Sequence, residues 1–208
     1  DVGRWKVESA AETLRALNPE VAIEMHPIRL RADSAVDLFR RFDLILDCSD
    51  NFPTRFLIND ACFFAKRVLV WGAVLRFEGQ VATFRPGGDG PCYRCMLPEP
   101  PPPGVVPTCQ EAGIMGGVAG MTGAMQAIEA IKEILGIGQS LVGRMIYFDA
   151  LHFQWAEATV NKNPDCPLCG EHPSITRLVD IPYECSVDNG FLESLVEKDR
   201  DEMGAPGS

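Results

Sequence analysis

The sequence predicts an α/β fold: a partial Rossmann-like, doubly wound sheet that continues into antiparallel strands and carries a four-cysteine site. Three observations support this prediction. Helical and strand-like patterns alternate through the first part of the chain, as in parallel sheets. Beyond residue 75, extended segments instead flank one long helix. Two Cys-x-x-Cys pairs, in GPCYRC and in CPLCG, lie far apart in the sequence.

The first part of the chain supplies the alternating elements. We expect helices where apolar residues recur at helical spacing, and buried parallel strands where short apolar runs such as FDLILD occur. Asn18-Pro19 ends the first helix, and Asp33 is the expected N-cap of the second. In chain order, the prediction is a helix over 4–17, a strand over 21–25, a helix ending at 39, a strand over 42–47, a helix over 53–65 and a strand over 68–73.

The second part of the chain predicts antiparallel strands around one helix. Gly79 is a possible bulge in the first of these strands, and four consecutive prolines predict an extended connector over 98–107. The long helix should end before Gly136 and bury one apolar face, whose residues are Met121, Met125, Ile128, Ile131 and Leu135. The prediction is a strand over 76–84, a helix over 116–135 and strands over 144–148 and 153–160.

Composition and charge restrict the class of protein. The 208 residues are 46% hydrophobic and 23% charged, with a mean hydropathy of +0.00, which is typical of a globular protein with one substantial core. The net charge of −10 argues against a nucleic-acid partner, because such proteins usually present a basic patch. No apolar run approaches the length of a membrane-spanning helix, so we expect no membrane partner.

The two cysteine pairs predict one structural zinc site. Cys92 and Cys95 form the first pair, and Cys166 and Cys169 form the second. Four thiolates complete a tetrahedral shell and leave no position for water or substrate. The alternatives are two unrelated structural pairs, or disulfides. A zinc tetrathiolate fits a reducing compartment, so the expected location is cytoplasmic.

A polar segment, LDCSDNFPTR, directly follows a predicted buried strand. In open α/β sheets, ligands bind beyond the carboxyl ends of the strands, where this segment presents Asp47, Asp50, Asn51 and Arg55. A carboxylate at this edge can hold Mg²⁺ against phosphates, and an arginine can bind phosphate oxygens through two hydrogen bonds. The alternative is a helix cap with a surface ion pair. Lys6, in the first turn of the opening helix, could bind a phosphate as a point charge.

One cysteine belongs to neither pair. Cys109 follows the proline-rich connector in a segment expected to be exposed, which is a plausible setting for a nucleophilic thiolate. The sequence places no recognisable base beside it.

Several segments, taken together and in order, resemble the MoeB/ThiF family of ubiquitin-activating-enzyme-like adenylyltransferases. The resemblance covers about residues 1–170, and both cysteine pairs fall in register. We therefore expect a partial adenylation domain over 1–170 and a partly mobile tail over 171–208. The segments are GRWKVESA, LDCSDNFPTRFLINDAC, GAVLRFEGQV, GPCYRC, PTCQEAG, AIEAIK, YFDAL and CPLCG.

The resemblance implies an activity, cofactors and partners. Members bind ATP and Mg²⁺ and adenylylate the carboxyl terminus of a ubiquitin-like sulfur carrier ending in Gly-Gly, for molybdopterin, thiamine or tRNA-thiolation sulfur transfer. It implies that Asp50 is the magnesium-linked catalytic aspartate and that Asn51 lies beside the nucleotide. It also implies that Lys6 binds the phosphates and that Arg55 helps there. Cys109 matches a cysteine that forms an acyl intermediate in some members. The resemblance also implies a homodimer and a zinc ion on the four paired cysteines.

One departure from the family pattern limits these expectations. The family's opening strand and glycine-rich loop are not found, and no GxGxxG occurs. We therefore expect the sequence to be a fragment that binds ATP weakly by itself and is inactive alone. The competing hypothesis is a non-catalytic, zinc-stabilised module that docks a carrier or completes a dimer. A nicotinamide dehydrogenase is excluded because the dinucleotide fingerprint is absent.

Overall fold

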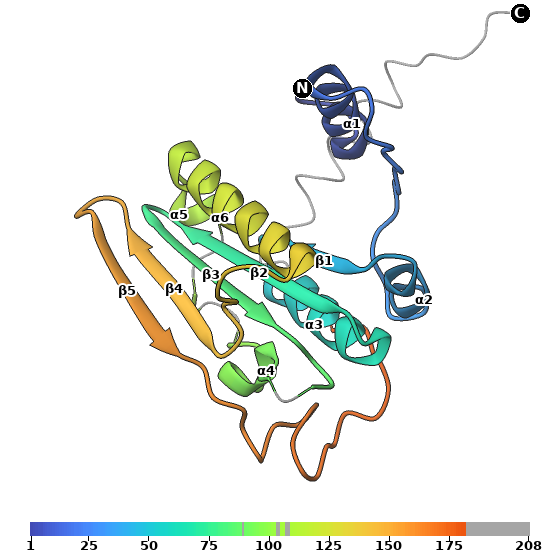
Figure 1. Ribbon diagram of the computed structural model, residues 1–208, viewed down its shortest axis with the longest axis vertical. Coiled ribbons are helices and arrows are strands. Elements are labelled where there is room, and N and C mark those ends of the chain that lie inside the picture. Colours follow the sequence, from blue (N-terminus) through green and yellow to red (C-terminus); the bar gives the residue numbers. More distant parts are fainter. Residues whose placement is uncertain (89, 103–104, 107–108, 182–208) are drawn as a thin grey trace, which may run out of the picture.

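A five-stranded sheet forms the centre of the computed structural model, which describes residues 1–88, 90–102, 105–106 and 109–181 (Figure 1). Strands β1 and β2 are parallel, and every later neighbouring pair is antiparallel. The predicted change from parallel to antiparallel pairing is therefore confirmed. The strands lie in the sheet in chain order: β1 (Leu44–Asp47), β2 (Val68–Leu75), β3 (Glu78–Phe84), β4 (Arg144–Asp149) and β5 (Gln154–Thr159).

The two longest helices that pack on the sheet cover its opposite faces. Helix α3 lies behind the sheet in Figure 1 and α6 lies in front of it, whereas α1 lies apart from the sheet. No helix in the described ranges is both long and apolar enough to cross a bilayer. The helices are α1 (Lys6–Leu17), α2 (Ala35–Arg40), α3 (Phe52–Ala65), α4 (Tyr93–Met96), α5 (Cys109–Ala112) and α6 (Gly116–Leu135).

Alternation along β2 sends its side chains to the two faces. Leu69 and Trp71 are buried in the core cluster that contains Phe56 of α3. On the other face, Gly72 contacts Gln126 of α6, because a Cβ there would lie 2.4 Å from the Gln126 Cδ. Strand β2 thus ties both helices to the sheet next to β1.

Two local predictions near the N-terminus are wrong. Residues 21–25 form no strand, and Val21 and Met25 are exposed. Within the described ranges, no strand pairs with this segment, so its apolar residues have no sheet face to cover. Asp33 does not cap α2, because the N-cap position falls on Ser34.

Two further predictions about the second part of the chain are wrong. Gly79 is no bulge: it pairs in register with Val74 and Phe148, and its missing side chain leaves room for the Phe148 ring, 2.3 Å from where a Cβ would stand. The apolar stripe of α6 does not face the core, because Ile128 and Ile131 are exposed. The buried face of α6 consists of Val118, Thr122, Gln126, Glu129 and Ala130.

Residues beyond 170 return to the body of the protein. Leu178 and Ile181 pack against the main core, and Asp180 Oδ1 accepts a hydrogen bond from the Ala32 backbone N–H at 2.9 Å. The predicted mobile part of the tail, including Glu193 to Gly207, lies outside the described residues. The boundary at residue 170 stays a prediction.

Candidate functional site

Residues 48–51 form a loop, here called the SDN loop, between the end of β1 and the start of α3. Asn51 is the N-cap of α3, and its Oδ1 accepts a hydrogen bond from the Thr54 backbone N–H at 2.9 Å. Its Nδ2 donates to Asp50 Oδ1 at 3.2 Å. The cap and the amide together orient the exposed Asp50 carboxylate beyond the carboxyl end of β1, where α/β sheets bind ligands.

Beneath the loop, two charged side chains are buried. Asp47 is fully buried, and its Oδ1 accepts from the Ser49 backbone N–H at 2.8 Å. Burial raises the pKa of the Asp47 carboxyl, although its contact with Ser49 and the charge of Arg55 oppose the rise. The Arg55 guanidinium donates from Nη2 to the Ser49 carbonyl at 3.2 Å and lies over the Phe52 and Trp71 rings. Arg55 therefore faces the underside of the loop.

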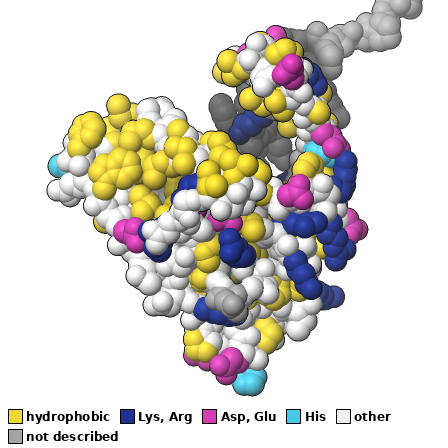
Figure 2. All heavy atoms as spheres, viewed as in Figure 1, with side chains coloured by type: hydrophobic (Ala, Val, Ile, Leu, Met, Phe, Trp, Pro, Cys, Tyr) yellow, Lys and Arg dark blue, Asp and Glu magenta, His cyan; other side chains and the backbone are white. Residues whose placement is uncertain are grey.

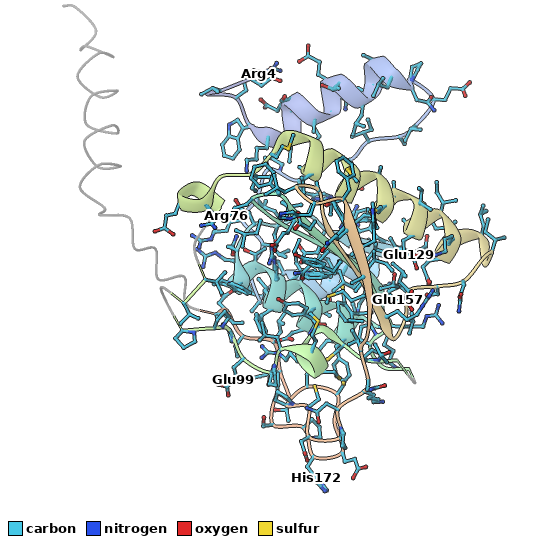
Figure 3. All side chains as sticks on the ribbon, turned by 90° about the vertical axis from the view of Figure 1, so that its left-hand side faces the viewer. Arg4, Arg76, Glu99, Glu129, Glu157 and His172 are labelled. Carbon is cyan, nitrogen blue, oxygen red and sulfur yellow. The ribbon has the colours of Figure 1, made fainter. Side chains whose placement is uncertain are left out.

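Two other predicted site residues belong to other elements. Lys6 is exposed on α1, the helix that stands apart from the sheet in Figure 1. Figure 3 places Arg4, which precedes α1, at one end of the molecule and His172, which follows the second cysteine pair, at the other. Cys109 begins α5, and its side chain lies outside the described parts of the structure. The roles expected for Lys6 and Cys109 stay predictions.

The four paired cysteines come together beside α4, at the lower end of the molecule in Figure 1. Their Sγ atoms all lie within 4.8 Å of one another, and the separations between neighbours run from 3.3 to 3.9 Å. These distances exceed a disulfide bond, which is about 2.05 Å long. They fit four thiolates around one ion, because Zn–S bonds of about 2.3 Å at tetrahedral angles separate the sulfurs by about 3.8 Å.

The backbone around the cysteines is also shaped like a metal site. The Cys92 N–H lies 3.5 Å from Cys95 Sγ, and the Cys169 N–H lies 3.5 Å from Cys166 Sγ. Gly170 is needed, because a Cβ there would lie 2.3 Å from the Pro164 carbonyl oxygen. Contacts with Cys169 and Cys92 lower the pKa of the Cys95 thiol, whereas the Cys92 pKa is raised. Four such crowded thiols ionise together only around a cation, so the residues fit a zinc ion.

A buried ion pair ties the first cysteine pair to α3. Arg94, between Cys92 and Cys95 in the sequence, donates from Nε and Nη2 to the two Asp60 oxygens, each at 2.8 Å. Its Nη1 donates to the Pro98 carbonyl at 2.7 Å. Both side chains are less than a tenth exposed. Sequence reasoning missed this pair, since FLINDAC and CYRC carry no sign of a shared partner.

Comparison with known proteins agrees with the motif order and the geometry. The sequence profile described as the ThiF family matches residues 1–168. The chain belongs to the ThiF family. The sulfur carrier protein adenylyltransferase of Thermus thermophilus is 46% identical over 191 residues, which are 90% of this chain and 70% of that protein.

Two further comparisons show how much of the matched proteins this chain spans. The probable adenylyltransferase/sulfurtransferase MoeZ of Mycobacterium tuberculosis is 45% identical over 90% of this chain but only 47% of its own length. The crystal structure of E. coli MccB with ATP superposes with a TM-score of 0.66 at 18% identity, over 81% of this chain and 52% of that chain. The chain thus spans about half of these proteins and shares the ThiF-type fold.

Proposed function

We propose that this ThiF-family chain supplies part of the active site of an enzyme that adenylylates the C-terminal glycine of a ubiquitin-like sulfur carrier ending in Gly-Gly. The observation that carries the proposal is the Asp50 carboxylate, held by Asn51 beyond the carboxyl end of β1. The Thermus relative, named a sulfur carrier protein adenylyltransferase, supports the choice of reaction and substrate.

The proposed reaction needs positioning and charge neutralisation. The carrier carboxylate attacks the α-phosphorus of ATP, forming an acyl–phosphate bond as the bond to pyrophosphate breaks. Magnesium, when bound, neutralises phosphate charge, and the hard carboxylate oxygens of Asp50 suit that ion. Asn51 fixes the Asp50 carboxylate, and Lys6 is the proposed cation for the phosphates. Cys109 is the proposed thiol that forms an acyl intermediate with the carrier.

Zinc is the proposed occupant of the four-cysteine site. Its closed sulfur shell would make it structural, and it would join the segment after residue 163 to the segment that follows β3. Free thiols kept as metal ligands fit a reducing compartment, so we place the protein in the cytoplasm. Along the sequence, the two cysteine pairs flank the proline-rich connector, Cys109 and α6. We expect the carrier tail to approach this region.

Asp50→Ala is the direct test of the proposed activity. We expect carrier-dependent ATP–pyrophosphate exchange by the full-length protein to fall about 100-fold or more, because charge on the phosphates is then poorly neutralised. Asp43→Ala, which removes an exposed acid at the opposite end of β1, is the matched control and should exchange normally. Equal exchange by wild type and Asp50→Ala would refute the assignment and favour a non-catalytic docking module.

A homodimer is the proposed assembly. Support comes from a large exposed apolar surface (Figure 2), formed by α6 and by the β4–β5 turn. Its members include Ile128, Ile131, Leu135, Leu151 and Phe153. Sedimentation velocity at micromolar concentration should give a dimer, and Ile131→Glu should shift the equilibrium toward the monomer. A monomeric wild-type protein would contradict the proposal.

A further inference from the structure

Three side chains hold the backbone of the SDN loop and of Asp47, the residue directly before it. Asp47 accepts from the Ser49 N–H, and Arg55 donates to the Ser49 carbonyl, so both polar groups of one peptide segment are bound by buried charges. The third side chain is Gln126 of α6, whose Nε2 donates to the Asp47 carbonyl at 2.8 Å. The loop is therefore fixed directly before the residue that carries the proposed catalytic carboxylate.

Gln126 connects this loop to the opposite face of the sheet. Besides the Asp47 carbonyl, its Nε2 lies 3.3 Å from the Val70 carbonyl, and its Oε1 lies 3.7 Å from Cys48 Sγ. The amide reaches these groups because Gly72 has no side chain: a Cβ at Gly72 would collide with Gln126 Cδ, Oε1 and Nε2 at 2.4–2.8 Å. Thus α6 is joined to the carboxyl end of β1 and to the part of β2 that pairs with it.

This arrangement is more polar than packing alone requires. In the described part of the chain, several buried polar atoms around the loop have no hydrogen-bond partner. They are Asp47 Oδ2, Ser49 Oγ, Arg55 Nε and Trp71 Nε1. Burying a carboxylate with an unsatisfied oxygen costs stability, whereas an apolar or neutral side chain of similar size would not carry that cost. Such features are expected where a site is kept in place for function rather than for stability.

We infer that Asp47, Arg55 and Gln126 are positioning residues, which fix the SDN loop so that Asp50 meets the reacting phosphates in the correct geometry. The inference rests on the proposed adenylylation and adds residues that do not themselves touch substrate. Arg55 acts here on the Ser49 carbonyl, from below the loop. Misplacing a catalytic group by about 1 Å can lower a rate about 100-fold, so the chemistry gains from a loop whose backbone is held by three side chains.

The test compares two buried carboxylates in the full-length protein. Asp47→Asn removes a charge that binds the loop. Glu129→Gln removes a buried charge of α6 that instead accepts hydrogen bonds from the Thr83 hydroxyl and the Leu141 N–H. Glu129 is labelled in Figure 3, on α6 beside the sheet. Each variant is assayed for carrier-dependent ATP–pyrophosphate exchange, melting temperature and hydrogen–deuterium exchange over residues 47–52.

We expect Asp47→Asn to keep or raise the melting temperature, while its kcat falls about 10- to 100-fold and its KM for ATP changes less than about threefold. Amides of the SDN loop should exchange faster. Gln126→Met, which keeps the size of the side chain but removes its donors, should also lower kcat. Glu129→Gln should melt at a lower temperature, with kcat and SDN-loop exchange close to wild type.

Three results would overturn these conclusions in distinguishable ways. If wild type exchanges, Asp50→Ala does not, and Asp47→Asn keeps its kcat, then the positioning role is wrong and the proposed function stands. If Asp47→Asn and Glu129→Gln lose kcat equally, the effect of Asp47 is structural. If the wild-type protein supports no carrier-dependent exchange, the proposed function fails and the positioning role fails with it.

Discussion

Replacing Cys166 with alanine is expected to remove the zinc ion and to destabilise the protein strongly. Three remaining thiolates cannot close a tetrahedral shell, and the crowded sulfurs 3.3–3.9 Å apart would then repel when ionised. Structural zinc contributes about 10 kcal/mol to the folding free energy of small domains. We therefore expect the free energy of unfolding to fall by more than about 3 kcal/mol. Metal analysis and thermal melts measure both effects.

A second buried cysteine separates the metal effect from simple loss of packing. Cys62 is fully buried in α3, outside the four-cysteine cluster, and burial raises the pKa of its thiol. Cys62→Ala should cost about 1 kcal/mol through a small cavity and should keep one zinc per chain. Retention of full zinc content by Cys166→Ala would contradict the proposed ligand set, and a chelator should reproduce the Cys166→Ala melt in the wild-type protein.

Local chemistry made several features predictable from sequence. The four cysteines were predicted because each Cys-x-x-Cys pair presents two thiols to one point, and two such pairs complete one shell. The helix over 116–135 was predicted with its observed bounds, because apolar periodicity runs into Gly136, which adopts a φ of 63°. The SDN loop was located because polar residues directly follow an apolar strand.

Long-range partners were not predictable. The apolar stripe of α6 suggested a core face, but periodicity does not say what a helix packs against. Its polar side packs on the sheet because Glu129 binds Thr83 and the Leu141 N–H, and Gln126 binds the Asp47 carbonyl. These partners lie 12 to 79 residues away in the sequence, and the space for Gln126 depends on Gly72. The strand expected over 21–25 failed similarly, since a strand requires a neighbour.

The second large effect is expected for Asp60→Asn, which leaves the Arg94 guanidinium buried without its carboxylate. The pair is joined by two 2.8 Å hydrogen bonds, and the guanidinium also lies 4.6 Å from the centre of the Phe56 ring. Removing one partner of a buried ion pair costs about 3–5 kcal/mol, since the remaining charge is not solvated. Chemical denaturation of the full-length protein should show this loss, together with weaker zinc retention, because Arg94 lies between two of the proposed zinc ligands.

Two comparisons decide whether burial of the Asp60–Arg94 pair causes the expected loss of stability. Asp37→Asn breaks the exposed Asp37–Arg40 pair of α2 and should change stability little, because solvent screens that pair. The double variant Asp60→Leu with Arg94→Met removes both buried charges and should be more stable than Asp60→Asn, because no charge remains unpaired. If Asp60→Asn were as mild as Asp37→Asn, the ion pair would not hold α3 to the first cysteine pair. The four-cysteine site would then be held together by its proposed metal–sulfur bonds alone.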